Sequence, residues 1–292
     1  MTAPNTRPEV WCWVHSDGED VAQVEAGSGQ CVAFVQKDPT RALDDGCQDA
    51  AAVVSWSGAA SALVVADGVG GHRDGALAAR LAVDSITSRL VDERPEGLAV
   101  QSAVLAGIET ANQQLIKQRG GAATTILVAV IHGNELRSLH AGDSELLVVG
   151  QRGKLKHQTV SHSPVGYGLE AGLIEADDGL DHEDRHLISS CVGMEAMRVE
   201  VASAIHLAAR DTVVLASDGL WDNLHVAEVA EIVRKGPLEL AVRELVAQCQ
   251  QRMRGEDGAV AGKPDDLSIL LYRRKLVRDA ARHGTVVANT QP

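Results

Sequence analysis

The order of two kinds of apolar pattern restricts the fold of this chain more than any other feature. Short Val-rich runs come first (CVAFV, AAAVVSW and SALVVA), and they predict strands. Two apolar stripes with helical spacing follow, from Ala79 to Leu90 and from Val104 to Leu115. Three more strands, helices near 225–234 and 237–253, and a strand at 267–272 complete the order. Grouped strands alternating with paired helices predict a layered α+β fold of antiparallel sheets covered by helix pairs.

Length and composition limit the domain organisation and the partners. The 292 residues suit one large domain, which we expect to span 1–292 with a core near 30–273 and loose terminal segments. The net charge of -13 argues against nucleic acid and against anionic membranes as partners. The five cysteines are scattered without a CxxC pair, and no apolar run reaches about 18 residues. These features predict a cytoplasmic location.

Aspartates lie at the margins of several predicted strands. They are Asp49, Asp67, Asp143, Asp218, Asp265 and Asp266. Each one alone is an ordinary turn or cap residue. If the strand ends converge, however, the carboxylates form an oxygen-only, strongly negative site, which suits Mg²⁺ or Mn²⁺ and not zinc.

Several short motifs carry a family resemblance. In chain order they are GCQDA (46–50), VADGVGGH (65–72), AATTILVAVI (122–131), AGDSE (141–145), LASDGLWDNL (215–224) and DDLSILL (265–271). They resemble the successive motifs of the metal-dependent Ser/Thr protein phosphatases, the PPM or protein phosphatase 2C-like family, in its bacterial form. The resemblance implies a four-layer α-β-β-α sandwich, with two antiparallel sheets between helix pairs and a binuclear Mg²⁺ or Mn²⁺ centre at one end.

The resemblance also implies metal ligands. Asp67 would bridge two metal ions, and the carbonyl group of Gly68 would bind one of them. Asp218 and Asp265 would complete the coordination of the other ion. Asp143, together with Asp218, would help to bind a third and weaker metal ion.

The remaining expectations concern catalysis and partners. Asp49 would hold metal-bound water, and His72 would either shuttle protons or begin the next helix. Water activated between two cations would attack phosphorus in phosphoserine or phosphothreonine, so no protein nucleophile is needed. The expected partners are a phosphorylated protein and a cognate Ser/Thr kinase.

Some positions depart from the family pattern. Asp45 stands where the family has an arginine that grips substrate phosphate, and the nearest upstream arginine is Arg41. Glu145 and Ser190 also stand where arginine is common, and Ser161 replaces an aspartate. The metal ligands are kept while basic residues on the phosphate side are lost. A catalytically weak pseudophosphatase acting as a regulatory module is therefore the alternative to an active phosphatase.

The segment HEDRH (182–186) matches a zinc-protease pattern of two histidines four residues apart. In such proteases the motif lies on an apolar helix, but neither flank here has helical periodicity. Together with SHSPVGYGLEAGLI (161–174), the segment resembles instead the mobile flap of the phosphatase family. We therefore predict no zinc site at His182 and His186.

Overall fold

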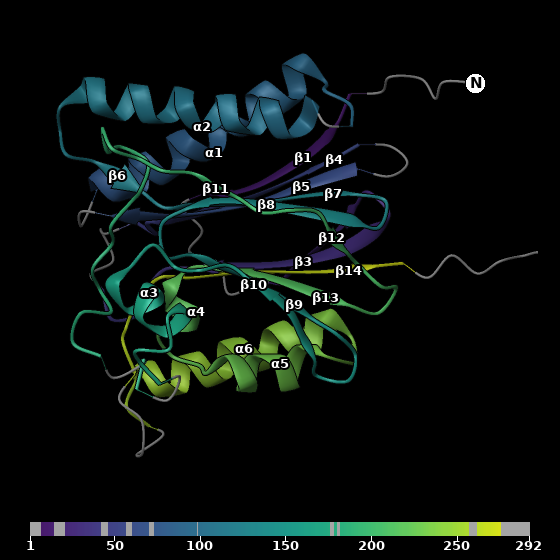
Figure 1. Ribbon diagram of the computed structural model, residues 1–292, viewed down its shortest axis with the longest axis vertical. Helices are drawn as coiled ribbons and strands as arrows, with labels where there is room; N and C mark the ends of the chain where they lie inside the picture. The colour runs from purple at the N-terminus through teal and green to yellow at the C-terminus, as the bar shows by residue number, and fades with distance from the viewer. Residues whose placement is uncertain are drawn as a thin grey trace, which may run out of the picture.

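The computed structural model has four layers, with two sheets face to face and helices on both outer sides (Figure 1). Every strand pairing in the described residues is antiparallel. The predicted fold class is therefore confirmed. The structure describes residues 7–14, 21–41, 46–56, 60–69, 73–97, 99–175, 178–179, 182–256 and 262–275.

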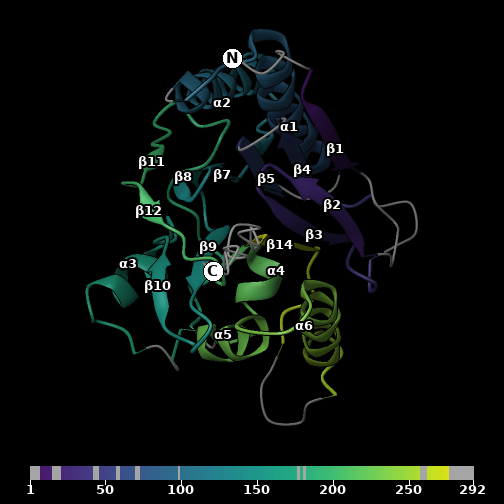
Figure 2. The ribbon, with the colours of Figure 1, turned by 90° about the vertical axis from the view of Figure 1, so that its right-hand side faces the viewer.

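The first sheet has the strand order β1-β4-β5-β7-β8-β11, with β6 paired to β5 and β12 paired to β8. Helices α1 (Arg73–Glu93) and α2 (Ala99–Gln118) cover its outer face (Figure 2). The strands are β1 (Glu9–Val14), β4 (Asp49–Ser55), β5 (Ala60–Val69), β6 (Ala123–Thr124), β7 (Ile126–His132), β8 (Glu135–Ala141), β11 (Glu200–Val201) and β12 (Ile205–His206).

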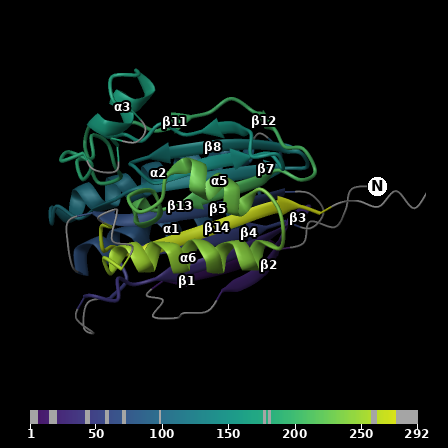
Figure 3. The same cartoon turned by 90° about the horizontal axis from the view of Figure 1, so that it is seen from below.

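The second sheet has the order β10-β9-β13-β14-β3-β2. Helices α5 (Val226–Val233) and α6 (Leu238–Met253) lie across its outer face (Figure 3). Two short helices, α3 (Pro164–Glu170) and α4 (Asp218–Trp221), complete the described elements. The strands are β2 (Ala22–Ala26), β3 (Gly29–Gln36), β9 (Glu145–Val149), β10 (Leu155–Gln158), β13 (Thr212–Ala216) and β14 (Leu267–Arg274).

Strand β5 shows why the central runs are apolar without interruption. Successive side chains of a strand point to opposite faces. Leu63 and Val65 pack into the core between the two sheets, whereas Ala62 and Val64 pack into the core beneath α1 and α2. Both faces of the sheet are therefore buried, and the alternation of polar and apolar residues typical of a half-exposed strand is absent from this run.

The structure corrects one detail of the sequence interpretation and assigns a segment that the sequence left open. The apolar run before Asp67 predicts a strand that ends there, but β5 continues to Val69 because Gly68 and Val69 pair with β6. Asp67 therefore lies within a strand. The polar segment 159–186, which has no clear periodicity, contains α3, whose first turn is capped by Ser163 accepting the Gly166 N–H. None of the described helices combines the length and the apolar character needed to cross a membrane.

Candidate metal centre

The strand-margin aspartates gather at one end of the sandwich. Asp49 begins β4 and lies opposite Asp67 in the register of β4 and β5. Asp218 follows the end of β13, and Asp265 precedes the start of β14, which pairs with β13. Asp143 lies in the turn between β8 of the first sheet and β9 of the second. The antiparallel order therefore brings together residues that are more than 200 positions apart in the chain.

Hydrogen bonds join the two sheets at this end. The Ser217 hydroxyl donates to Asp49 Oδ2 over 2.7 Å, and the Ser268 N–H donates to Ser217 Oγ over 3.0 Å. Asp266 Oδ2 accepts the Gln48 N–H over 2.6 Å. Because these bonds link the start of β4 to β13 and β14, they fix the distance between carboxylates from different sheets.

Burial and the neighbouring carboxylates make it unfavourable for the acids of this site to ionise. Burial, followed by the charge of Asp266, raises the pKa of Asp49 well above its usual value. Burial and Asp218 do the same to the pKa of Asp67 and of Asp143. Burial and Asp218 also raise the pKa of Asp265 to about 7. A site of this kind favours a cation that allows all the carboxylates to ionise.

Asp222 and Lys263 belong to the same cluster. Burial and Asp218 raise the pKa of Asp222 to about 6. The Lys263 ammonium lies 2.6 Å from Asp218 Oδ2, 2.8 Å from Asp222 Oδ2 and 3.1 Å from Asp265 Oδ2. Burial alone would lower the pKa of Lys263, but the three carboxylates raise it above its ordinary value. Lys263 therefore acts as a counter-ion inside the cluster.

Arg41 is the second cation. Its guanidinium donates to Asp265 Oδ1 over 3.2 Å and to Asp266 Oδ2 over 3.3 Å. It also lies 3.7 Å from Asp38 Oδ2. These contacts hold the residues just before β14. Arg41 therefore helps to fix the position of the Asp265 carboxylate.

The donor set fits divalent metal ions. One oxygen each of Asp49, Asp143 and Asp218 is buried without a hydrogen-bond donor among the described residues. Such orphaned oxygens are costly unless a partner is supplied. In the described part of the chain, Lys263 and Arg41 form salt bridges with Asp218, Asp222, Asp265 and Asp266, and the charge of Arg185 also acts on Asp222. Together with Asp49, Asp67 and Asp143, these acids make seven carboxylates, which outnumber the three cations. Oxygen ligands with this excess of negative charge suit Mg²⁺ or Mn²⁺.

Comparison with known proteins identifies the family. A family model described as Protein phosphatase 2C matches residues 41–259. The chain belongs to this family of Ser/Thr protein phosphatases. The predicted resemblance is therefore confirmed.

Individual relatives support the assignment. Protein phosphatase PhpP of Streptococcus pneumoniae serotype 2 is 29% identical over 178 residues, which are 59% of this chain and 72% of PhpP. Serine/threonine phosphatase stp of Listeria welshimeri is 26% identical over 232 residues, 75% of this chain and 88% of that protein. The crystal structure of Stp1 from Staphylococcus aureus matches with a TM-score of 0.73 and 23% identity, over 87% of this chain and 98% of Stp1. That likeness shows the fold.

Around Asp67, Thr124 at the end of β6 and Thr125 between β6 and β7 fix the backbone. The Asp67 N–H donates to Thr125 Oγ1 over 2.9 Å, and the Thr124 hydroxyl donates to the Asp67 carbonyl over 2.8 Å. Thr125 Oγ1 in turn lies 2.8 Å from Ser144 Oγ, next to Asp143. The hydroxyl network thus connects two of the candidate ligands and determines where Asp67 sits.

Gly68 and Gly75 allow helix α1 to begin against this part of β5. A Cβ atom built on Gly68 would lie 2.3 Å from the Gly75 carbonyl carbon, and one built on Gly75 would lie 2.8 Å from the Gly68 carbonyl oxygen. No real Cβ atom tolerates either distance, so both positions require glycine.

We expect the Gly75→Ala variant to displace the Gly68 carbonyl group and to weaken Mn²⁺ binding by about tenfold, equivalent to about 1.4 kcal/mol. No charge changes in this variant, so a weaker Kd measured by calorimetry would report geometry alone. Gly120→Ala is the matched control, because nothing lies within 4 Å of its added Cβ. Unchanged Mn²⁺ affinity in Gly75→Ala would show that the Gly68 carbonyl group is not a ligand.

The remaining residues singled out in the sequence either bond to residues outside the carboxylate cluster or lie outside the described part of the chain. His72 and Asp45 lie outside the described residues. Ser161 donates to Ser163 Oγ, and Ser190 Oγ accepts the Arg198 N–H. Both serines are buried and bonded to their own surroundings.

Glu145, at the start of β9, accepts from Gln158 Nε2 over 2.8 Å. The hydrogen bonds of Ser161, Ser190 and Glu145 therefore all go to residues outside the carboxylate cluster.

In HEDRH, residues 183–186 form turns, and His182 Nδ1 accepts the Asp184 N–H. This local geometry differs from the helix on which a zinc-protease pair depends. We therefore keep the prediction that replacing His182 and His186 together removes no bound zinc, which elemental analysis would test.

The sequence interpretation missed Asp222 and Lys263. Asp222 is four residues after Asp218, a spacing that places both on one side of a helical turn, so the DGLWD string contained the signal. Lys263 is two residues before Asp265, but a lysine next to an acidic loop is ordinary on a surface. Its insertion among the carboxylates depends on the fold.

His140, His162 and Glu200 form a separate cluster near the flap. Their potential ligand atoms lie within 4.8 Å of one another. The Gly142 N–H donates to His162 Nδ1 over 3.3 Å, so the neutral ring carries its proton on Nε2, which faces Glu200 at 3.7 Å. His140 Nε2 lies 2.9 Å from the Val160 carbonyl oxygen. These contacts describe a hydrogen-bonded cluster in which Nε2 of His162 has no free lone pair for a metal ion.

Acid is expected to destabilise the protein through these histidines. Burial lowers the pKa of His140, and burial with the neighbouring His140 lowers that of His162, although Glu200 opposes this effect. In the unfolded chain a histidine titrates near pH 6.5. The stabilisation is thus complete above that pH and is lost as the pH falls toward the lower folded-state pKa.

Urea midpoints at pH 7.5 and 5.5 would measure this loss as a difference between proteins, because carboxylates with a raised folded-state pKa, such as Asp265 and Asp222, oppose it over the same pH range. Acidification should lower the midpoint of His140→Asn less, or raise it more, than that of wild type, whereas His132→Asn, at an exposed position, should respond like wild type. An equal acid response in all three proteins would contradict the assignment.

Proposed function

We propose that this chain hydrolyses phosphoserine and phosphothreonine in proteins at a centre of two Mg²⁺ or Mn²⁺ ions, with a third ion bound more weakly. The observation that carries the proposal is the set of buried carboxylate oxygens without donors, on Asp49, Asp143 and Asp218. When bound, two such ions lower the pKa of water and neutralise the charge that develops on the phosphoryl oxygens.

Each residue has a proposed task. Asp67 would hold both ions, the Gly68 carbonyl group would bind one of them, and Asp218 and Asp265 would bind the other. The support is geometric: Asp67 is held by Thr124 and Thr125, and Asp265 by Arg41. Asp143 supports the third ion together with Asp218, whose charge contributes to its raised pKa.

Asp49 would orient the attacking water. One of its oxygens accepts from Ser217 and the other has no donor, so the carboxylate has a fixed orientation and a free acceptor. His72 is a candidate proton carrier because it follows the glycines after Asp67, with a place at the start of the next helix as the alternative. A Ser/Thr kinase that forms the phosphorylated protein is the expected partner.

A structure of the catalytic domain of PstP is described as a complex with two manganese ions. It aligns with 84% of this chain, with a TM-score of 0.65 at 24% identity. This likeness supports the fold, and the donor chemistry described above supports the proposed ligands.

Hydrolysis of an aryl phosphate and of a phosphothreonine peptide, with and without Mn²⁺, tests the function. We expect turnover that requires Mn²⁺ or Mg²⁺ and disappears when a chelator is in excess. Full activity in excess chelator would refute the metal centre. Tight Mn²⁺ binding without turnover would favour the pseudophosphatase alternative, to which the replacements at Asp45, Glu145 and Ser190 point.

A further inference from the structure

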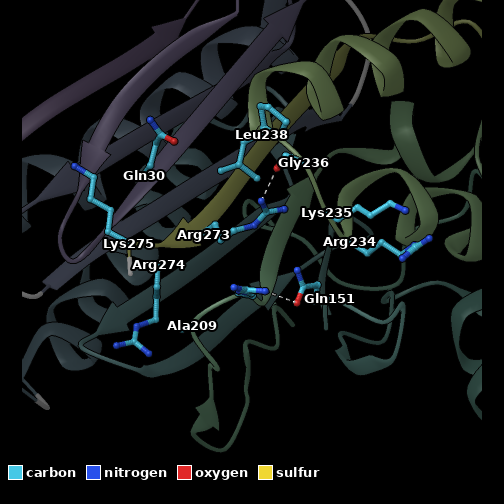
Figure 4. A pocket seen from close by; sticks show the side chains of 12 residues that line it. Gln30, Gln151, Ala209, Arg234, Lys235, Gly236, Leu238, Arg273, Arg274 and Lys275 are labelled. Carbon is cyan, nitrogen blue, oxygen red and sulfur yellow. Dashed lines mark hydrogen bonds between the residues drawn. The ribbon is translucent and has the colours of Figure 1, made fainter. Parts of the chain in front are cut away.

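A cavity of about 340 Å³ lies at the end of β13 and β14 opposite to the carboxylates. It is formed by the residues before β13, the last residues of β14 and the connection between α5 and α6. β14 has eight residues, so the cavity lies roughly 25 Å from Asp265 at about 3.3 Å per residue. Figure 4 shows the side chains that line it. It is thus a separate place from the candidate metal centre.

The lining is strongly basic. It includes Arg210, Arg234, Lys235, Arg273, Arg274 and Lys275, and none of the lining residues is acidic. The whole chain has 27 lysines and arginines against 40 aspartates and glutamates. Glu231 pairs with Arg234 and Glu25 with Lys275, so four of the six positive charges are left without a carboxylate partner in the described part of the chain. This local excess runs against the composition of the protein, and it creates a positive potential in this cavity.

Three of the six cations have structural partners. Arg273 donates to the Gly236 carbonyl over 2.6 Å, as Figure 4 shows, and also to Thr212 Oγ1 and the Val233 carbonyl. It braces the end of β14 against the connection between α5 and α6. Arg234 pairs with Glu231, and Lys275 pairs with Glu25.

The other three cations, Arg210, Lys235 and Arg274, have N–H groups that can donate to a bound anion. In the described ranges, no carboxylate forms a salt bridge with Arg210, Lys235 or Arg274. Arg210 donates to the neutral Gln151 Oε1 over 3.1 Å. Arg274 donates to the Leu207 carbonyl through Nη1, while its buried Nε has no hydrogen-bond partner among those residues. A donor of this kind is costly unless an acceptor is supplied.

Helix α6 adds to the positive potential. It begins at Leu238, which lines the cavity, and its N-cap residue Pro237 provides no side-chain hydrogen bond. The first N–H groups of a 16-residue helix carry a partial positive charge and favour anions. Glu239 in the same turn is paired with Arg243, which limits how far its carboxylate offsets this charge. Two independent features, the unpaired cations and the helix N-terminus, thus converge on one cavity.

We infer that this cavity binds a small phosphate-bearing anion. Guanidinium, ammonium and helix N–H groups are the donors that recognise phosphate oxygens, and a phosphate group brings several acceptors and about two negative charges. The volume lies at the lower end of the range typical of small-ligand sites, about 300–1,000 Å³. The ligand is either inorganic phosphate or pyrophosphate, or a phosphate ester such as a nucleotide.

Calorimetric titration of the full chain, freed of metal by a chelating resin, tests the inference. The probes are inorganic phosphate, pyrophosphate, AMP and ADP, with citrate as a non-phosphate anion. We expect saturable binding of at least one phosphate probe, weakened by added salt. A nucleotide that binds more tightly than pyrophosphate identifies the ester as the ligand, and the reverse order identifies the inorganic anion.

The Arg210→Gln/Lys235→Gln double variant should weaken the Kd by about tenfold or more, because it removes two charge-assisted donors. Both residues are exposed, so folding should be unaffected. The matched control Arg80→Gln/Lys117→Gln removes two exposed positive charges from α1 and α2. The inference is wrong if no phosphate probe saturates, if citrate binds equally well, or if both double variants bind like wild type.

Discussion

Replacing Asp67 by Asn is expected to lower Mn²⁺-dependent phosphatase activity by about 10³-fold, which corresponds to several kcal/mol of lost transition-state stabilisation. Asn has the same shape but one fewer anionic oxygen, and the proposed bridge contributes to both metal sites at once. The fold should persist, because the backbone of Asp67 is held by Thr124 and Thr125 rather than through its side chain.

Stability supplies a readout independent of turnover. In the metal-free protein, Asp67→Asn removes one charge from a cluster in which burial, Asp218 and Asp49 raise the pKa of Asp67. The metal-free Tm should therefore stay the same or rise, while the increase in Tm produced by Mn²⁺ shrinks. Asp84→Asn, on the exposed side of α1, is the control and should change neither quantity. Wild-type activity or an unreduced Mn²⁺ shift in Asp67→Asn would refute the bridge.

The fold could be predicted from the sequence because its signals are local. Helical stripes such as Ala79 to Leu90 fall within α1, and the runs before Asp67 and Asp218 fall within β5 and β13. Periodicity and the antiparallel arrangement of neighbouring strands were enough for these elements. The strand-margin positions alone left the convergence of the aspartates open, and only the resemblance of the ordered motifs to the phosphatase family implied it.

What the sequence did not reveal depends on contacts between distant segments. The close approach of Gly68 to Gly75 requires α1 to start against β5, and either glycine alone reads as an ordinary turn residue. The basic cavity joins residues near 210, 236 and 274, and the net charge of -13 hides it. Arg41, a candidate for the missing phosphate-binding arginine, instead contacts Asp265 and Asp266. Only the fold places these groups together.

Replacing Lys263 by Met is expected to have two effects of opposite sign. In the metal-free protein the Lys263 ammonium contacts Asp218, Asp222 and Asp265 and is only partly exposed. Removing one partner of such a buried ion pair typically costs about 3–5 kcal/mol. For a chain of this size we expect the metal-free Tm to fall by roughly 5–10 °C.

Mn²⁺ affinity should change in the other direction. A divalent ion bound to Asp218 and Asp265 competes with the ammonium group for the same oxygens, so wild-type protein must break these ion pairs before it binds metal. Lys263→Met has no such pairs to break, and its Kd for Mn²⁺ should be at least about tenfold tighter, or about 1.4 kcal/mol. Saturating Mn²⁺ should then bring the Tm of variant and wild type close together.

Lys156→Met is the matched control for this prediction. Lys156 pairs with the buried Asp211, away from the cluster, so its loss should lower the metal-free Tm without changing Mn²⁺ affinity. A third result separates two tasks for Lys263. If Lys263→Met leaves Mn²⁺ affinity unchanged but raises KM for the phosphothreonine peptide, the ammonium group does not compete with metal and instead grips the substrate phosphate in place of the missing arginine. A tighter Kd with unchanged KM would establish Lys263 as the counter-ion that Mn²⁺ displaces.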